Sequence, residues 1–264
     1  PPFDYPIVKM TKKLEAKYIA EAWDLWPDNF AVYGLMSRNN PIMKVAYQIE
    51  KYYYYAADEI VFTFKGAFDY LKNKGWTTET KIDMDHVHYI NNGIDLEQFD
   101  KDVMAHPRKD ADLNDPDTYK IIYLGSINLS NNVKTLIEAA KQLQNIPKYR
   151  FIFYGDGAQR EQLEQQVKQQ EIKNVVFKEK WIPLAECAWI VSQATVNVMN
   201  YSKGFAYMGL SAGKLFQYLA AGKPIVCNVK ISYDDIITDN NLGVARDLIT
   251  AEEFVTEIRR IAEQ

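Results

Sequence analysis

The chain has 264 residues, of which 47% are hydrophobic and 25% charged, and its formal net charge is −4. This length is sufficient for two hydrophobic cores of about 100–150 residues each. The acidic balance and the lack of Lys/Arg clusters interleaved with aromatic residues argue against a nucleic-acid-binding surface, so no nucleic-acid partner is expected. No apolar run approaches the roughly 18–20 residues that cross a membrane.

The two cysteines are better explained as structural thiols than as metal ligands or a disulfide. Cys187 and Cys227 lie in apolar or helical contexts without the spacing of a metal site. Reduced thiols are typical of the cytoplasm, so a cytoplasmic protein is expected. The first residues, Pro-Pro-Phe-Asp-Tyr-Pro, contain neither an initiator methionine nor a signal peptide, which predicts that the chain begins inside a longer protein.

The first half alternates short apolar runs with helical patterns. Strands are predicted at residues 17–23, 59–64 and 87–91. A helix is predicted to begin at Asn40-Pro41, because apolar residues then recur at helical spacing: Ile42, Val45, Ala46, Ile49 and Tyr53. Another helix is predicted after residue 64, ending near Gly75.

A linker is predicted at residues 101–118, which are charged, contain two prolines and show no apolar periodicity. We therefore predict two domains, residues 1–115 and 116–264. The second half then places strands at 120–124, 150–154, 174–177, 195–199, 224–227 and 243–245. Helical patterns lie between these strands, and this alternation is typical of a doubly wound α/β domain.

The stretch from Gly209 to Val226 predicts an anion site. Its small residues 211–213 would let a phosphate approach the backbone, and a helix over about residues 214–221 would direct free N–H groups and the positive end of its dipole at that phosphate. Lys214, in the first turn, adds a full positive charge.

This stretch resembles the phosphate-binding loop, helix and strand of family 4 glycosyltransferases (group 1), retaining enzymes with the GT-B fold that use nucleotide sugars. It is most similar to a bacterial branch that reads Ser-Pro-x-Lys-Leu-Phe-(Asp/Glu)-Tyr-Met-Ala-Ala-Gly-Lys-Pro, as in cell-surface polysaccharide (fucosamine-type) transferases. Ala212 replaces the proline of that branch and Gln217 replaces its acid. Gly209 stands where most members have a glutamate. The resemblance extends to residues 24–27, 57–66 and 90–99.

The resemblance implies an α/β protein with two Rossmann-like domains, of which the N-terminal one is incomplete here. It implies retaining transfer of a hexosyl or N-acetylhexosaminyl group from a UDP-linked donor to a saccharide or lipid-linked acceptor in cell-surface polysaccharide synthesis. No cofactor or metal is expected, and peripheral association with the inner face of a membrane is left open. The chain alone is expected to bind donor nucleotide without transferring sugar.

The resemblance also implies the site residues. Lys214 would stabilise the departing diphosphate, and Asp24, with Glu21 behind it, would face the sugar at the reaction centre. Ser126 and Asn131 occupy positions usually held by Arg and Lys. Donor-binding residues are expected to be Gly125, Ser126, Asn131, Gly155, Trp181, Ile182, Gly209, Leu210, Ser211, Lys214 and Gln217.

Other motifs have simpler explanations. Residues 155–160 lack the third glycine of a dinucleotide-binding loop and predict a strand-to-helix turn. On a strand, Asp83 and Asp85 would face away from His86 and His88, which favours a surface edge over a metal site. The tyrosines at 52–55 predict helix packing. No hydrolase elbow or epimerase signature is found, and a non-catalytic nucleotide-sugar-binding module remains the alternative function.

Overall fold

The computed structural model describes residues 4–32, 34–77, 79, 81–202, 209 and 211–264. The chain folds into two compact units. The first contains the described residues within 1–92, 203–211 and 232–234, and the second contains residues 93–202, 212–231 and 235–264.

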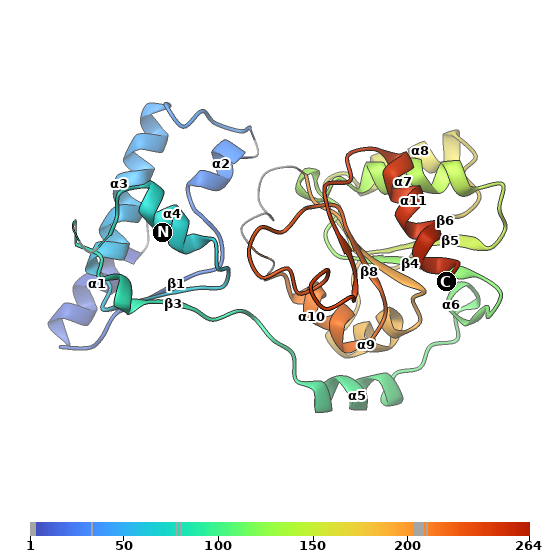
Figure 1. Cartoon of the computed structure of the whole chain (residues 1–264), viewed down its shortest axis with the longest axis horizontal. Helices are drawn as coiled ribbons and strands as arrows, with labels where there is room; N and C mark the ends of the chain where they lie inside the picture. Colours follow the sequence, from blue (N-terminus) through green and yellow to red (C-terminus); the bar gives the residue numbers. More distant parts are fainter. Residues whose placement is uncertain (1–3, 33, 78, 80, 203–208, 210) are drawn as a thin grey trace. The chain divides into compact units, whose positions relative to one another are not determined.

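The first unit is built on a three-stranded parallel sheet of order β1-β2-β3 (Figure 1). Its strands are β1 (Ile19–Ala22), β2 (Glu59–Phe62) and β3 (Val87–Tyr89). Its helices are α1 (Asp4–Lys13), α2 (Asp28–Val32), α3 (Pro41–Ala56), α4 (Ala67–Asn73) and the 3₁₀ helix η1 (Met84–His86). The three strands predicted from the sequence are confirmed, each one or two residues shorter at one or both ends.

Helix α3 begins where the sequence predicts. The Asn40 side chain accepts a hydrogen bond from the Ile42 N–H at 2.9 Å, and Pro41 occupies the first helical position, where it needs no hydrogen-bond acceptor. Of the four consecutive tyrosines, Tyr53 and Tyr54 are buried, whereas Tyr52 is exposed. Tyr54 packs edge-on against Phe62 of β2. The predicted packing role of these tyrosines is therefore confirmed.

The surface strand edge favoured for residues 83–88 is wrong for its first half. The Asp83 carboxylate accepts a hydrogen bond from the Asp85 N–H at 3.1 Å, which caps the 3₁₀ turn η1, and β3 begins only at Val87. The turn brings His86 and His88 to one carboxylate, that of Glu59, at 3.2 and 2.7 Å. Within the described part of the chain, no group of three or more His, Cys, Asp or Glu side chains is arranged to hold a metal ion.

The expectation of a helix-free linker from residue 101 is also wrong. Helix α5 (Leu96–Ala105) crosses this position, and α6 (Ala111–Asn114) follows it. The Asp95 side chain caps α5 by accepting from the Gln98 N–H at 2.9 Å. Phe99 and Val103 pack inward at helical spacing. Phe99 lies before residue 101, where the linker was predicted to begin, and Val103 lies after it. Each of the two predicted segments therefore contained only one of these apolar residues, and the helical spacing was not recognised.

The second unit contains a six-stranded, all-parallel sheet of order β6-β5-β4-β7-β8-β9. All six strands predicted for this half are confirmed: β4 (Tyr119–Leu124), β5 (Tyr149–Tyr154), β6 (Val175–Phe177), β7 (Val196–Met199), β8 (Ile225–Cys227) and β9 (Gly243–Ala245). Between them lie η2 (Leu129–Asn131), α7 (Val133–Leu143), α8 (Arg160–Gln169), α9 (Leu184–Ser192) and α10 (Gly213–Ala220), with α11 (Ala251–Ala262) last.

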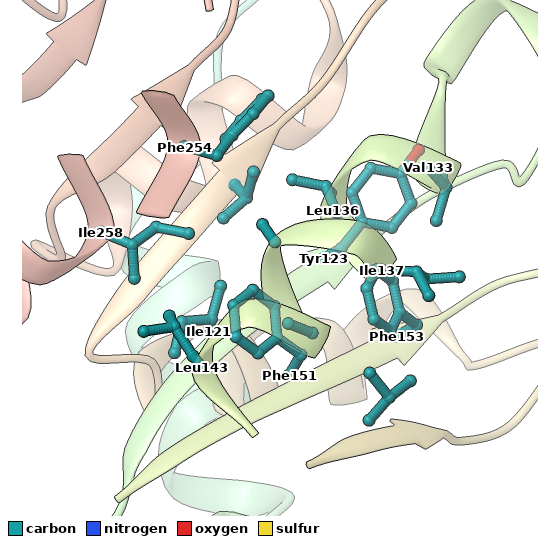
Figure 2. Close-up of a cluster of buried hydrophobic side chains, with 14 of the residues drawn as sticks. Ile121, Tyr123, Val133, Leu136, Ile137, Leu143, Phe151, Phe153, Phe254 and Ile258 are labelled. Carbon is teal, nitrogen blue, oxygen red and sulfur yellow. The ribbon is translucent and has the colours of Figure 1, made fainter. Parts of the chain in front are cut away.

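Both faces of this sheet are covered. Ile121 and Tyr123 of β4 belong to one buried cluster, whereas Ile122 between them belongs to another on the opposite face. In Figure 2, side chains of α7 and α11 pack on the first face over the strands, including Leu136 and Ile258. Burial of each such side chain stabilises the fold by about 1.5–3 kcal/mol. Two-sided burial explains why these strands read as continuous apolar runs in the sequence.

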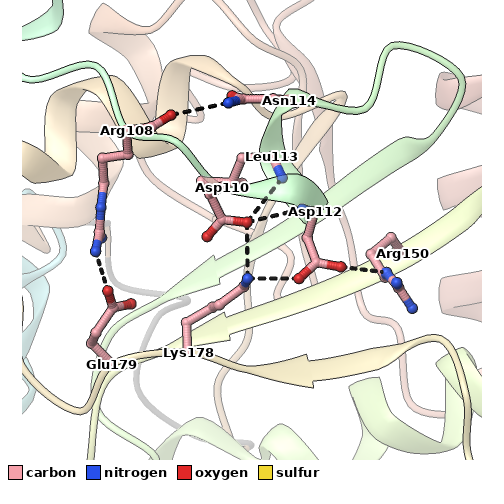
Figure 3. Close-up of polar contacts among 8 residues, drawn as sticks. All are labelled: Arg108, Asp110, Asp112, Leu113, Asn114, Arg150, Lys178 and Glu179. Atoms are coloured by element: carbon pink, nitrogen blue, oxygen red, sulfur yellow. Dashed lines mark hydrogen bonds and ion pairs between the residues drawn. The ribbon is translucent and has the colours of Figure 1, made fainter.

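A polar network fixes the segment that precedes β4 (Figure 3). The Lys178 ammonium lies 2.9 Å from an Asp110 carboxylate oxygen and 2.6 Å from one of Asp112. Arg150 reaches the other Asp112 oxygen at 2.9 Å, and Arg108 pairs with Glu179. Burial opposes ionisation of Asp110, but the Lys178 ammonium outweighs it and lowers the pKa of that carboxyl. These contacts tie α6 to β5 and to the end of β6.

Candidate functional site

The order of the second sheet places its topological switch point between β4 and β7. These strands are neighbours, but the chain continues from β4 towards β5 on one side and from β7 towards β8 on the other. Loops that leave two such strands diverge, and ligands of doubly wound sheets bind in the space between them. Gly125 and Ser126 follow β4, and Asn200 and Tyr201 follow β7.

Two glycines let the loops after β4 and β5 meet through backbone atoms. Gly125 has φ +152° and Gly155 has φ +120°, conformations that side chains rarely adopt. A Cβ atom at Gly155 would lie 1.9 Å from the Gly125 carbonyl oxygen, so no larger residue fits. The predicted turn at residues 155–160 is confirmed, since β5 ends at Tyr154 and α8 begins at Arg160.

Lys214 directs its ammonium group at this backbone junction from the first turn of α10. Its Nζ atom would be 3.3 Å from a Cβ atom placed on Gly125. The same atom lies over the rings of Tyr123 and Tyr201, 4.9 and 5.1 Å from their centroids. Burial of the ammonium lowers the pKa of Lys214 to about 8. No acidic side chain among the residues described by the structure pairs with it.

Helix α10 is held at the end of β4 by its own tyrosine. The Leu124 N–H donates a hydrogen bond to the Tyr218 hydroxyl at 3.0 Å, and the Tyr218 side chain is fully buried. This contact places the start of α10 beside Gly125. Within the part of the chain that the structure describes, no side chain caps that start, so the first N–H groups of the helix have no capping partner there.

The loop from Ser126 to Asn132 contributes neutral polar groups. The Asn131 amide donates to the Ser126 hydroxyl oxygen at 2.8 Å. Asn200, which the sequence did not single out, donates to the Asn132 carbonyl at 2.6 Å, and its own Oδ1 atom is buried without a partner in the described structure. A polar residue directly after β7 was the only signal for Asn200 in the sequence.

A buried arginine joins this junction to the segment after β6. The Arg160 guanidinium donates to the carbonyl oxygens of Gly155 and Lys178, and the Gly155 N–H donates to the Glu179 carbonyl at 3.1 Å. Of the two residues expected to contact the base, Trp181 is 80% exposed, whereas Ile182 packs partly into the core. Nothing in the sequence indicated this role for Arg160, which stands where a dinucleotide-binding loop would have its third glycine.

The other predicted donor-binding residues lie in different parts of the structure. Gln217 lies one turn after Lys214 on α10, and its Oε1 atom is buried with no partner in the described structure. Gly209 has φ +126° and groups with the first unit, as Ser211 does. Leu210 lies outside the described residues. The structure thus gathers Gly125, Ser126, Asn131, Gly155 and Lys214 in one unit.

Asp24 and Glu21 lie in the first unit. They line a cavity of about 900 Å³ along β1, together with Trp23 and Trp26. The Trp23 indole N–H donates to Glu21 at 2.7 Å. Desolvation raises the pKa of Asp24, against the effect of a hydrogen bond with Asn29. Glu50, on the wall of the same cavity, is buried, unlike Asp24; desolvation raises its pKa to about 8, although the Tyr70 hydroxyl donates to it.

Both Cys187 and Cys227 are free, buried thiols. Of the helices that the structure describes, none has the length and apolar character needed to cross a bilayer.

Several solved structures share the fold of this chain at low sequence identity. HepE (Alr3699) of Anabaena, in complex with UDP and glucose, is 12% identical with a TM-score of 0.68 over 97% of this chain and 65% of its own. A TarM variant of S. aureus, in complex with fondaparinux, alpha-GlcNAc-glycerol and UDP, is 14% identical with a TM-score of 0.68 over 100% of this chain and 47% of its own. WaaG, a glycosyltransferase involved in lipopolysaccharide biosynthesis, is 16% identical with a TM-score of 0.67 over 98% of this chain and 72% of its own.

These likenesses confirm the predicted α/β GT-B fold class. The chain spans less than two thirds of the length of HepE and TarM. A search of curated proteins finds no match. A family model described as glycosyl transferases group 1 matches residues 106–264, which is more than half of the sequence. The chain therefore belongs to the group 1 family of glycosyl transferases.

Proposed function

We propose that the second unit binds the diphosphate of a nucleotide sugar at the carboxyl ends of β4 and β7, and that the protein transfers the sugar from that donor. The observation that carries this proposal is the Lys214 ammonium. It lies beside Gly125 on a half-buried side chain and has no acidic partner among the described residues. A desolvated cation without a counter-charge is costly, and an anionic ligand offsets that cost.

The same geometry supplies a catalytic role. As the bond between sugar and diphosphate breaks, negative charge builds up on the departing phosphate oxygen. Lys214 and the free N–H groups at the start of α10 face that charge in a partly dry site, where each donor contributes on the order of 3 kcal/mol to the transition state. An approaching diphosphate raises the pKa of Lys214 and keeps it protonated.

The details of the donor come from the family resemblance and the related structures. UDP is the nucleotide in the HepE and TarM complexes, and we adopt it for this protein. We assign the base to the Trp181 and Ile182 segment and the ribose to Gln217, whose Oε1 atom lacks a partner. Asp24 and Glu21 are assigned to the sugar. The transfer is proposed to retain configuration, require no metal, and act on a saccharide or lipid-linked acceptor in polysaccharide synthesis.

Calorimetric titration with UDP tests the binding proposal. The wild-type chain should bind UDP, Lys214→Met should lose most of that affinity, and Lys141→Met, an exposed lysine on α7, should bind normally. Absence of UDP binding by the wild type, or equal affinity of all three proteins, would contradict the proposal. Retention is tested separately by the anomeric configuration of a transfer product in NMR spectra.

A binding module without turnover is the second candidate function. The observation that favours it is the amide of Gln217 at the position where related sequences carry a carboxylate, together with Gly209 at the second acidic position. UDP release from UDP-sugars by the complete protein, in the presence of saccharide acceptors, separates the two candidates. Binding without release of UDP supports the module.

A further inference from the structure

Ser211 is held within the first unit by two side chains that are distant in the sequence. It groups with that unit, although Ala212, which is bonded to it, belongs to the second unit and directly precedes helix α10. The Asn92 amide donates a hydrogen bond to the Ser211 carbonyl oxygen at 2.6 Å. The Thr63 hydroxyl donates to the Ser211 hydroxyl oxygen at 3.1 Å. The backbone and the side chain of Ser211 therefore have separate partners, 119 and 148 residues away in the sequence.

The hydroxyl of Thr63 is not needed for packing. Thr63 directly follows β2 and is only 1% exposed, so its hydroxyl is shielded from water. A buried hydroxyl is costly without a hydrogen-bond partner, and the Ser211 oxygen supplies that partner. Valine has the same branched shape and carries no such cost. The contact with Ser211 is thus what distinguishes threonine from valine at this position.

The direction of this hydrogen bond leaves the Ser211 hydroxyl able to donate. A serine hydroxyl has one hydrogen to donate and can accept two hydrogen bonds. Because Ser211 accepts from Thr63, its own hydrogen is available, and no acceptor for it lies among the residues that the structure describes. A hydroxyl that accepts a hydrogen bond also becomes a stronger donor.

We propose that Thr63 is a positioning residue for sugar transfer: it orients the Ser211 hydroxyl so that this hydroxyl donates to a phosphate oxygen of the nucleotide sugar. Asn92 assists by fixing the Ser211 carbonyl, and with it the backbone that leads into α10. Both residues act through Ser211. The inference rests on the proposed function, in which the diphosphate lies at the start of α10.

Orientation of a neutral donor matters in this protein because the candidate site has few charges. Ser126 and Asn131 are neutral, and Lys214 is the cation beside the backbone junction. Neutral hydrogen bonds are weaker than charge-assisted ones, so each depends more on being correctly aligned before the ligand arrives. A side chain and backbone that are already held also lose less conformational freedom on binding.

Calorimetric titration of the full chain with UDP tests this proposal. Thr63→Val should weaken UDP binding about 3- to 10-fold, because the orienting hydrogen bond is lost. Thr63→Ser keeps the hydroxyl and should bind UDP like the wild type. Thr195→Val is the matched control. The Thr195 hydroxyl accepts from the Lys120 N–H at the amino end of β7, and its removal should leave UDP affinity unchanged.

A double-mutant cycle separates positioning from support of the fold. Ser211→Ala should weaken UDP binding at least as much as Thr63→Val does. In the Ser211→Ala background, Thr63→Val should cause no further loss, because the hydroxyl that it orients is already absent. A threonine that only supported the core would weaken UDP binding by the same factor in both backgrounds. Circular dichroism checks that each variant is folded.

The part played by Asn92 has its own comparison. Asn92→Asp keeps the shape of the side chain but removes the N–H group that donates to the Ser211 carbonyl, so UDP binding should weaken. Asn91→Asp adds the same charge one residue earlier, where the side chain contacts the Tyr89 hydroxyl. It should weaken UDP binding less. Equal losses would show that charge alone is responsible and would overturn the role of Asn92.

The outcomes distinguish this inference from the proposed function. If the wild type binds UDP and Thr63→Val binds it equally well, the inference is overturned while the donor site stands. The same holds if the effects of Thr63→Val and Ser211→Ala simply add. If the wild type does not bind UDP, both the donor site and the inference are overturned.

Discussion

The ammonium group of Lys214 lies over the ring of Tyr123, 4.9 Å from its centroid, so the positive charge of the candidate site rests on an aromatic face and not on a carboxylate. A cation held in this way attracts an anion but destabilises the fold that holds it. Affinity and stability should therefore respond to this residue in opposite directions.

Lys214→Met should weaken UDP binding by about 1.5–3 kcal/mol, roughly 10- to 150-fold, because a hydrogen bond from a charged donor is lost. The same change should raise the free energy of unfolding at pH 7 by about 1–3 kcal/mol, because no buried ammonium remains. Calorimetry and chemical denaturation measure the two effects. A variant that loses affinity and stability together would show that Lys214 supports the fold.

The pH dependence follows from the pKa of Lys214, which burial lowers to about 8. The unfolded lysine keeps its ordinary, higher pKa, so between these values the unfolded chain binds more protons and the contribution of Lys214 to stability rises with pH. UDP affinity should instead fall as the pH rises above 8. Both trends should be absent in Lys214→Met, whereas Lys141→Met should keep them.

Gly155→Ala should destabilise the second unit by about 3 kcal/mol or more, because a methyl group would collide with the Gly125 carbonyl in a conformation that side chains avoid. Thermal unfolding measures the loss. Gly93→Ala is the matched control, since no atom lies within 4 Å of its added methyl group. Equal stability of the two variants would show that the loops after β4 and β5 are not in backbone contact.

Arg160→Lys should cost about 2–4 kcal/mol of stability and weaken UDP binding, because an ammonium group cannot reach the Gly155 and Lys178 carbonyls at once. Arg259→Lys, an exposed arginine on α11 that pairs with Glu263, should change stability by less than about 1 kcal/mol. Loss of stability without loss of UDP affinity would separate Arg160 from the nucleotide site.

Glu50→Gln should flatten the pH dependence of stability in the first unit. Burial raises the pKa of Glu50 to about 8, so the folded state retains a proton that the unfolded state releases near the ordinary pKa of a glutamate. Stability from this group is complete below the unfolded pKa and declines as the pH rises to about 8. Unfolding at pH 5 and pH 9 measures this, with exposed Glu97→Gln as the control, which should behave like the wild type.

The sequence predicted the strands well because parallel strands buried on both faces read as apolar runs, as Ile121 to Tyr123 do. It also placed Lys214 at a helix start, since the small residues and the lysine are local signals. It missed Asn200 and Tyr201, because their contribution depends on loops after two different strands meeting at one point. The capped turn at Asp83 and helix α5 were missed because single side chains, Asp83 and Asp95, start them.

The backbone contact between Gly125 and Gly155 has a practical consequence for engineering. The junction is built from main-chain atoms and is held by the Arg160 side chain, so the Gly125–Gly155 contact itself involves no side chain of Ser126, Asn131 or Gln217. Ser126, Asn131 and Gln217 can therefore be varied to change the charge and hydrogen-bonding pattern of the candidate site while the backbone junction stays the same. A combinatorial library at these three positions is a direct way to redirect the protein towards other nucleotides.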